Sequence, residues 1–464
     1  MSSQATPVLE IECDELFDGH RLVKGARIRV EGGRISRVDA RGAEPDTLST
    51  DKPSPLRVAF AMPGLVDAHV HISGYREGMP AGVPFEPVKT FVRSCLYNGL
   101  TTLRDTGNSL ETILYLRKWT EKNNGPRIFS SGPLLDTPPL TWPFSRVVQT
   151  KEDARHHVEC LRLEGMDLIK TYVHITPEIM GAIVESATEA GLSVAADCAV
   201  TTPRQAAELG VRSLEHVANL LDSEMLDSTL KPGLSLVERA RAWSRVELES
   251  RGVASLIDLL LERQTVVCPT LLVSRRWCLI EEMVNDPYLD YAAAVMPYHK
   301  YFKRLRGPVG MAFGGRYMRQ YMPIPNLSRS ELVEVQGGLK RMGEMTRLLS
   351  QSGVRVVAGT DSPNPSLAPG FSLHQELAEM VRYGITPVAV LASATSSAAS
   401  LLGQADAGVV TPGANADLLL LDASPLDDMA NLARIRYVVC RGQLVDREPL
   451  LGQLKGAIKE MEAA

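Results

Sequence analysis

The sequence has no excess of basic residues and no long apolar run. Its 464 residues contain 50 lysines and arginines against 55 aspartates and glutamates, which gives a formal net charge of −5. This balance argues against binding to nucleic acid or to an anionic membrane surface. No apolar stretch approaches the ~20 residues of a membrane-spanning helix, and residues 1–13 lack the basic start and apolar stretch of an export signal. The sequence therefore predicts a cytoplasmic protein.

Cysteine is sparse and does not occur in motifs. The seven cysteines include no C-x-x-C pair, and an odd number does not suit a disulfide framework. We expect neither structural disulfides nor a zinc knuckle, and we interpret the cysteines mostly as small core residues. The 44% hydrophobic and 23% charged residues are typical of a globular chain. Disordered and fibrous classes are thereby excluded.

Both ends of the chain contain short segments with β-strand patterns. Near the amino end, two such segments flank residues 31–33, a Glu-Gly-Gly sequence that suits a tight hairpin turn. Near the carboxyl end, residues 417–422 and 437–440 form similar apolar runs, and a turn follows at residues 441–442. We therefore expect one sheet-based domain built from both termini.

Between these ends, short apolar runs alternate with longer stretches of helical periodicity. This alternation predicts repeated βα units and a parallel sheet. Eight such units favour a (β/α)8 TIM barrel, whose active site lies at the carboxyl ends of its strands. An open, doubly wound α/β sheet is the alternative, although the Gly-rich dinucleotide turn that such sheets often carry is absent. The candidate strands begin at Gly64, Thr101, Arg127, Asp167, Ser193, Ser213, Thr265 and Val354.

Two insertions interrupt this spacing. Residues 272–352 are rich in aromatic side chains, whereas the whole chain is only 5% aromatic. Such a segment either roofs the pocket or packs helices and subunits together, and it favours a homo-oligomer. The second insertion, from Pro133, is rich in proline and predicts a rigid loop on the same rim.

The strongest chemical signal is the pair His69 and His71 at the end of the first barrel strand. Side chains at positions i and i+2 of a strand lie on one face, so both imidazoles can face one cation. Taken alone, a His-x-His pair is more often a satisfied polar pair than a metal site. Its setting, at a strand end beside other polar strand ends, strengthens the metal interpretation.

Lys170 lies in an apolar strand segment, where an inward lysine needs a reason. Burial favours the neutral amine, which can react with carbon dioxide to give a carbamate, an anionic metal ligand. The alternative is that Lys170 extends to solvent or pairs with Asp167. His216 and Asp361 end later strands in the same way. Strand ends with His, Lys, His and Asp in one barrel predict a shared site.

Several motifs occur in order along nearly the whole chain. They include MPGLVDAHVH from Met62, GLTTLRD from Gly99, LEHV from Leu214, AGTDS from Ala358 and GVVTPGANADLLLLDASPL from Gly408. This set resembles the metal-dependent amidohydrolase superfamily, and within it the imidazolonepropionase and prolidase-like branch. The resemblance implies a small β-sandwich from residues 1–62 and 408–464. It implies a barrel over residues 63–407, with the insertion at about 272–352.

The resemblance also implies roles for individual residues. His69 and His71 would bind the more buried metal, Lys170 would be the carboxylated bridging lysine, and His216 would be a ligand from the sixth strand. Asp361 would touch both the metal and the attacking water, whose proton it would shuttle. The implied cofactor is a divalent cation, zinc or cobalt, at one or two per chain.

One position departs from the superfamily pattern. Relatives usually have a fifth-strand histidine in a run similar to VAVHAHG, whereas this chain has Asp197. The Asp197 carboxylate would bind a second metal, leave a single-metal site or pair with a substrate nitrogen. A further carboxylate favours harder, more oxygen-loving cations. The lost histidine also admits a binding protein on a catalytically decayed scaffold.

The expected reaction is metal-assisted hydrolysis of an amide-like carbon–nitrogen bond in a small molecule. Tyr172 and His174 follow Lys170 and are candidate substrate contacts, with plain rim structure as the alternative for both. In size and in its aromatic insertion the chain is similar to hydrolases of phenylurea and thiocarbamate compounds, including molinate hydrolases. A prolidase-like dipeptidase and a cyclic amide hydrolase are the other enzymatic interpretations.

Overall fold

The structure is a computed structural model of the 464-residue chain. It describes residues 8–40, 54–72, 85–142, 144–224, 234–295, 327–364 and 366–463. Within these ranges, no helix combines the length and the apolar character needed to cross a membrane. All seven cysteines lie in the described ranges, and all except Cys160 are buried.

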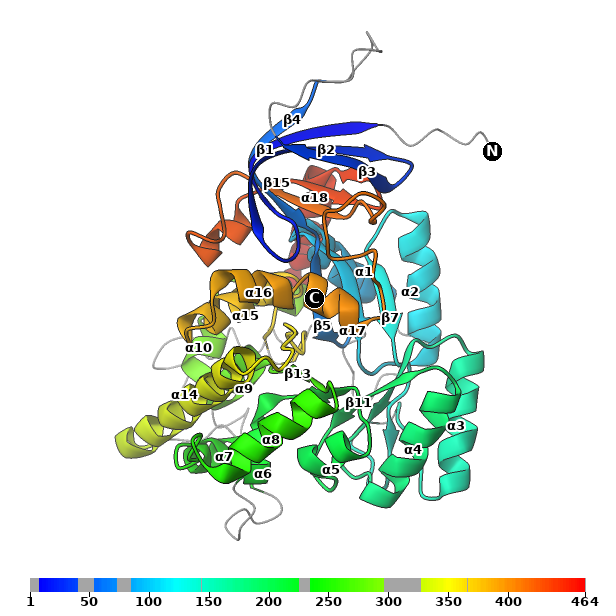
Figure 1. Cartoon of the computed structure of the whole chain (residues 1–464), viewed down its shortest axis with the longest axis vertical. Helices are drawn as coiled ribbons and strands as arrows, with labels where there is room; N and C mark the ends of the chain where they lie inside the picture. The colour runs from blue at the N-terminus through cyan, green and yellow to red at the C-terminus, as the bar shows by residue number, and fades with distance from the viewer. Residues whose placement is uncertain are drawn as a thin grey trace.

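Strands from both ends of the chain form one seven-stranded sheet, with the order β16-β15-β14-β4-β1-β2-β3. Figure 1 shows the blue amino-terminal strands beside the orange-red β15. The predicted hairpin joins β2 and β3. A sandwich needs a second sheet packed on this one, and that part stays a prediction. The strands are β1 (Leu9–Phe17), β2 (Leu22–Glu31), β3 (Arg34–Ala40), β4 (Leu56–Pro63), β14 (Leu418–Leu421), β15 (Ile435–Cys440) and β16 (Gln443–Val445).

The middle of the chain forms two parallel sheets, with the orders β5-β6-β7 and β13-β12-β11-β10-β8-β9. Seven of the eight predicted barrel strands are present among them. Every residue of β5 and β6, for example, is buried, as expected for parallel strands covered by helices on both faces. The strands are β5 (Leu65–Val70), β6 (Leu100–Asp105), β7 (Arg127–Ser130), β8 (Leu135–Asp136), β9 (Arg146–Val147), β10 (Leu168–Thr171), β11 (Ser193–Asp197), β12 (Ser213–Glu215) and β13 (Val266–Cys268).

Backbone hydrogen bonds connect the two parallel sheets on both sides. On one side, the Asp167 amide at the start of β10 donates to the Ser130 carbonyl of β7 at 3.0 Å. On the other side, the Ala68 amide of β5 donates to the Ala358 carbonyl at 2.9 Å. The segment with Ala358 also bridges to β13. These contacts link β7 to β10, and they link the segment with Ala358 to both β5 and β13.

The eighth predicted strand, which begins at Val354, differs from the expectation. Val356 bridges to β13 and Ser362 bridges to β5, but these are isolated bridges rather than a continuous strand. Asp361 has a φ of 63°. This left-handed conformation cannot continue an extended strand, so the ladder is interrupted where the chain turns into the site.

Helices follow most of these strands, and each buries one apolar face. In α8, for example, Val253, Leu256, Ile257 and Leu260 are buried at helical spacing, and Ser250 caps the first turn. The helices before the insertion are α1 (Phe85–Tyr97), α2 (Leu110–Lys122), α3 (Lys151–Leu163), α4 (Pro177–Glu189), α5 (Pro203–Glu208), α6 (Val217–Glu224), α7 (Leu236–Trp243) and α8 (Arg251–Glu262). After it come α15 (Phe371–Arg382), α16 (Pro387–Ser393), α17 (Ser396–Leu401), the 3-10 helix η2 (Met429–Ala433) and α18 (Arg447–Ala463).

The described part of the aromatic-rich insertion is helical. It comprises α9 (Leu271–Cys278), α10 (Ile280–Val284), α11 (Leu289–Val295) and α14 (Arg329–Gln351). The rings of Tyr288 and Tyr291 lie 4.4 and 4.6 Å from the ring of Phe371 in α15. Tyr288 and Tyr291 therefore pack helices together, which is one of the two roles expected for the insertion. The aromatic residues at 298–321 lie outside the described residues.

The proline-rich insertion is more ordered than the predicted loop. It contains β8, which pairs in parallel with β10 and with β9, the strand just after the insertion. Sequence patterns could not reveal these strands because each is only two residues long. The pairing places this insertion directly beside the strand that carries Lys170.

Candidate active site

His69 and His71 lie at the end of β5 and after it, and each ring is held by a second residue. His69 is 1% exposed, and its Nδ1 lies 2.7 Å from Oε2 of Glu215. The Nδ1 of His71 lies 3.0 Å from the carbonyl oxygen of Gly107. The two ring centroids are 5.3 Å apart. These contacts orient both imidazoles through the same ring nitrogen.

His216 follows β12, and its Nδ1 lies 2.7 Å from the Thr270 hydroxyl. Its ring centroid is 4.9 Å from that of His69. The opposite nitrogens of the three histidines face carboxylates. The Nε2 atoms of His69 and His71 lie 3.5 and 3.1 Å from Oδ1 of Asp361, and that of His216 lies 3.5 Å from Oδ2 of Asp197. The Nε2 atoms therefore line one shared space.

Three non-glycine residues at the site have left-handed backbone conformations. The φ values are 64° for His216, 47° for Thr270 and 63° for Asp361. Such conformations are unfavourable for side chains with a Cβ, and they are found mostly where a function requires them. Here they turn the chain at the strand ends and bring side chains of β12, β13 and the eighth segment to one place.

Lys170 is on β10, opposite Ala195 of β11, and is 1% exposed. Its Nζ has no hydrogen-bond partner among the described residues. Asp167, the partner considered for it, instead binds Arg117 and the Ser130 amide. Both simpler interpretations of Lys170, exposure to solvent and pairing with Asp167, are therefore wrong. A buried cation without a partner is costly, which points to a ligand or a modification.

Burial and mutual charges move the pKa values of the site residues. Burial and the positive charge of Lys170 lower the pKa of His69 to about 4. Burial also lowers the pKa of His71, but the hydrogen bond and charge of Asp361 outweigh it and raise that pKa. Although burial alone would raise the pKa of Asp197, the charge and hydrogen bond of His216 bring it to about 2. In Asp361, contacts with His71 and His69 outweigh burial and hold its pKa well below the usual range. Both carboxylates are thus anionic at neutral pH.

The donor set suits a metal ion. Ligand atoms of His69, His216 and Asp361 all lie within 4.8 Å of one another. Nitrogen and carboxylate oxygen are ordinary ligands of zinc and similar cations. The partner on each Nδ1 leaves Nε2 for the ion, which is the usual arrangement of a metal-binding histidine. The residues present therefore fit a divalent cation.

Tyr172 and His174 follow β10, the strand that carries Lys170. Burial raises the pKa of the Tyr172 phenol, and the negative charge of Asp197 raises it further. The ring Nδ1 of His174 lies 3.2 Å from Oδ2 of Asp136, and the His174 amide donates to the same carboxylate at 3.0 Å. Asp136 belongs to β8 and is buried. The proline-rich insertion thus holds His174 in place.

Sequence reasoning missed the residues that hold the predicted ones. Glu215 contacts His69, Thr270 contacts His216, and Asn219 donates to Oδ1 of Asp197 at 2.8 Å. A signal existed only for Glu215, because a glutamate in a short buried strand needs a partner. The others are ordinary loop and helix residues, and their contacts cross between separate elements.

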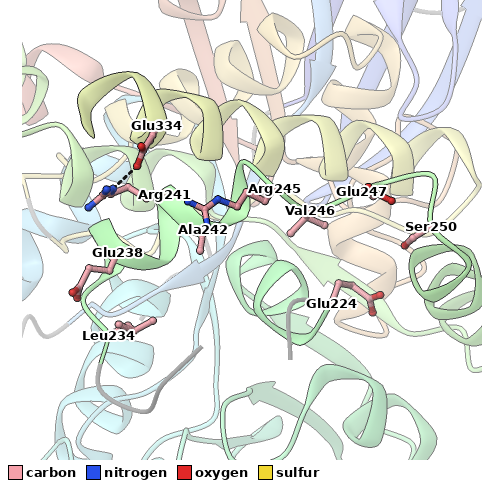
Figure 2. Close-up of a pocket in the computed structure, with 10 residues that line it drawn as sticks. All are labelled: Glu224, Leu234, Glu238, Arg241, Ala242, Arg245, Val246, Glu247, Ser250 and Glu334. Atoms are coloured by element: carbon pink, nitrogen blue, oxygen red, sulfur yellow. Dashed lines mark hydrogen bonds and ion pairs between the residues drawn. The ribbon is translucent and has the colours of Figure 1, made fainter. Parts of the chain in front are cut away.

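A cavity of about 600 Å³ lies elsewhere, between α6, α7, the start of α8 and α14. Figure 2 shows glutamates and arginines on its wall, with Arg241 bound to Glu334. None of the predicted site residues lines it. Among the described residues no metal-binding group lies at this cavity, which is separate from the site at the strand ends.

The model of the Amidohydrolase family matches residues 60–286 and 324–445, which is more than half of the chain. The chain belongs to the amidohydrolase family. The imidazolonepropionase of Deinococcus deserti is 42% identical over 85 residues, which cover 18% of this chain and 21% of that relative. The adenine deaminase 2 of Rhizobium etli is 30% identical over 143 residues, which cover 30% of this chain and 22% of that relative. This amidohydrolase thus matches only about a fifth of either relative.

Solved structures resemble this amidohydrolase over almost its whole length. A bottromycin amidohydrolase has a TM-score of 0.71 and 22% identity, covering 98% of this chain and 90% of its own. A Xaa-Pro dipeptidase with bound methionine has a TM-score of 0.66 and 20% identity, covering 95% of this chain and 100% of its own. Molinate hydrolase has a TM-score of 0.64 and 17% identity, covering 96% of this chain and 95% of its own. At these identities the likeness shows the fold, a TIM-barrel-type α/β fold.

The family match confirms the motif-based prediction of an amidohydrolase-family enzyme. The predicted fold class is confirmed as far as the α/β, TIM-barrel-type architecture. The structure brings His69, His71, His216 and Asp361 together and places Asp197 beside His216. Their roles as ligands or catalytic groups remain predictions.

His374 is expected to make folding stability sensitive to acid. Its Nε2 lies 3.0 Å from the Asn98 carbonyl, and burial lowers its pKa to about 4. The unfolded chain, with a histidine pKa near 6.5, takes up this proton first as the pH falls. The contribution of His374 to folding stability is therefore present above pH 6.5 and is lost as the pH falls towards 4. Between these limits, His374→Gln should reduce the slope of unfolding free energy against pH by up to about 1.4 kcal/mol per unit.

Urea unfolding at intervals from pH 7 to pH 4 would measure this slope. His20→Gln, on an exposed turn, is the matched control and should follow the unmodified chain. Parallel curves for His374→Gln and the unmodified chain would contradict the prediction.

Proposed function

We propose that this amidohydrolase is a metal-dependent hydrolase that cleaves an amide-like carbon–nitrogen bond in a small molecule. The observation that carries this proposal is the cluster of His69, His216 and Asp361 ligand atoms within 4.8 Å of one another. Lys170, on a nearby strand, has no hydrogen-bond partner for Nζ among the described residues. A decayed scaffold would have no reason to keep a buried, unpaired lysine, because its burial is costly. Retention of these groups therefore favours an active enzyme.

We infer that the eight strand segments close into a (β/α)8 barrel over residues 63–407. The hydrogen bonds that link β7 to β10 and the eighth segment to β5 support closure. Residues 1–62 and 408–464 then form the terminal domain, and 272–352 form the insertion. In such a barrel the active site is built from the carboxyl ends of different strands, which is where the histidines lie.

The proposed ligands are His69, His71, His216 and Asp361, together with a carbamate on Lys170. The carbamate forms when the neutral Lys170 amine attacks carbon dioxide, so that a nitrogen–carbon bond forms and one proton leaves. Its negative charge removes the cost of an unpaired cation. We assign Asp197 as a further ligand, because its Oδ2 shares the space that His216 Nε2 faces. Zinc or cobalt, at one or two ions per chain, suits this mixture of nitrogen and oxygen donors.

A divalent cation, when bound, supplies a lowered pKa for water, from 15.7 towards ~7, and polarises a carbonyl group. The chain's own residues supply the proton transfer. Asp361 accepts the proton of the attacking water while the new carbon–oxygen bond forms. It then returns that proton to the nitrogen as the carbon–nitrogen bond breaks. Asp361 is anionic at neutral pH, so its oxygens are available as acceptors, and the Asn364 amide, which donates to Oδ1 at 3.1 Å, orients it.

Tyr172 and His174 are the proposed substrate contacts. His174 is fixed through Nδ1 by Asp136, so its Nε2 is free to contact a substrate carbonyl or carboxylate. Thiocarbamates and ureas are the leading candidates within this reaction class. A prolidase-like dipeptidase is the second candidate, because the Tyr172 hydroxyl and the His174 ring offer donors for a free carboxylate.

Lys170→Ala is expected to lose most of its bound metal, because it removes the proposed carbamate. Added short-chain carboxylates such as acetate or propionate should restore part of the metal content. Elemental analysis of the purified protein, with and without these additives, measures both effects. Unchanged metal content in the variant would rule out Lys170 as a ligand.

Asp361→Asn is expected to keep bound metal but to lose turnover by about 10²–10⁴-fold, because the amide cannot accept the proton. The measurement is kcat on the best substrate together with metal content. Asp136→Asn is the comparison, since it changes a buried carboxylate that accepts from the Thr137 amide and holds the substrate-side His174, and it should alter KM more than kcat. A rate close to that of the unmodified enzyme in Asp361→Asn would refute the proton-shuttle role.

A substrate panel separates the remaining candidates. Aryl ureas, thiocarbamates, N-acyl amines, cyclic amides and dipeptides differ in the leaving group and in the presence of a free carboxylate. We expect hydrolysis of neutral carbon–nitrogen substrates and little activity on dipeptides. Preference for dipeptides, with KM raised in Tyr172→Phe, would instead favour the dipeptidase. Inactivity of the metal-loaded enzyme on every class would contradict the proposed function.

A further inference from the structure

A buried ion pair lies behind His69. Glu215, 1% exposed on β12, stands between Arg104 of β6 and the His69 ring. Its Oε1 accepts hydrogen bonds from Arg104 Nη1 at 2.9 Å and from the Ser213 hydroxyl at 2.8 Å. Its Oε2 lies 2.7 Å from His69 Nδ1. The two carboxylate oxygens therefore have different partners.

Arg104 is held firmly in this position. It is 2% exposed, and it also donates to the Ala68 carbonyl at 3.0 Å and to the Ser213 hydroxyl at 2.7 Å. Since the Ser213 oxygen accepts from Arg104, its own proton is directed at Oε1 of Glu215. Two donors thus converge on Oε1. Oε2 is left as an acceptor for His69.

This arrangement decides which ring nitrogen of His69 carries the proton. A carboxylate paired with arginine has no proton to donate, so a 2.7 Å contact requires a proton on His69 Nδ1. The neutral ring then has a lone pair on Nε2, the atom that faces Asp361. At His216 the partner is the Thr270 hydroxyl, which can donate or accept and therefore does not fix the tautomer.

We propose that Glu215, held by Arg104, is a positioning residue that locks His69 in the Nδ1–H tautomer and keeps Nε2 available for the metal ion. The inference rests on the proposed role of His69 as a ligand. It assigns a role to the Arg104–Glu215 pair that packing alone does not require, because an uncharged acceptor would fill the same space. A carboxylate behind a ligating histidine also raises its basicity.

Glu215→Gln tests this role because the replacement has nearly the same shape. Arg104 and Ser213 both donate at the Oε1 position, so the amide oxygen should take that position and the NH₂ group should face His69. Nδ1 must then accept, and the ring proton moves to Nε2. We expect the tautomer to reverse in the metal-free protein and metal affinity to fall by about 10–100-fold.

The tautomer is read from the chemical shifts of the ring nitrogens in protein labelled with ¹⁵N-histidine. The chain has nine histidines, so the spectrum contains few signals. His69→Asn assigns the signals, and zinc titration of the apo protein gives affinity. Asp417→Asn is the matched control: Asp417 is a buried carboxylate directly before β14, and it binds Arg127 of β7 at 3.1 Å. It should keep both the His69 tautomer and the affinity. Glu215→Asp, which retains the charge, should keep the Nδ1–H tautomer.

An Nε2–H tautomer in the unmodified apo protein would overturn the inference, and so would an unchanged tautomer and affinity in Glu215→Gln. The first measurement needs no variant, so a folding defect in Glu215→Gln would not prevent a decision. Failure of the proposed function looks different. In that case the unmodified protein binds no zinc, or His69→Asn binds it unchanged, while the ring shifts still report on Glu215.

Discussion

The candidate site depends on the pairing of buried polar groups, because an unpaired polar group inside a protein costs free energy. His69, His71 and His216 each have a partner on Nδ1, and Asp197 and Asp361 face histidine nitrogens. Lys170 Nζ, without a hydrogen-bond partner among the described residues, breaks this rule. The exception lies beside the strand end where the other groups converge. The unpaired Nζ therefore points to a ligand or a covalent modification that the side chains alone do not supply.

Charge balance makes the same point for the cofactor. A carbamate on Lys170 would join Asp197 and Asp361 as a third anion in a buried space. Three anions without a counter-charge would repel one another, since water screens them poorly there. The nearby histidines cannot supply the charge if their Nε2 lone pairs serve as ligands. Divalent cations would balance the anions, so carbamylation and metal binding support each other within the proposal.

The sequence predicted the residues that face the site better than those behind them. His69 and His71 were recognisable because i and i+2 on a strand share a face, and Asp361 because it ends a strand-like segment. Their partners were not recognisable, because the contact of Glu215 with His69 joins residues 146 positions apart. The fold, too, could be predicted only in part. Apolar runs revealed seven of the barrel strands, whereas the two-residue β8 and β9, and the break at Asp361, depend on tertiary contacts.

Substrate choice is expected to come from the parts of the chain that its motifs do not cover. Structures at 17–22% identity share this fold although their names describe different activities. Metal-binding groups at strand ends can serve many carbon–nitrogen bonds, so they do not distinguish one substrate from another. His174, by contrast, is held by Asp136, which belongs to the proline-rich insertion. Because β8 pairs with β10, this insertion is fixed to the strand of Lys170 and can present a defined surface to a substrate. Specificity would then depend on short insertions held by the barrel, while reactivity depends on the barrel strands themselves.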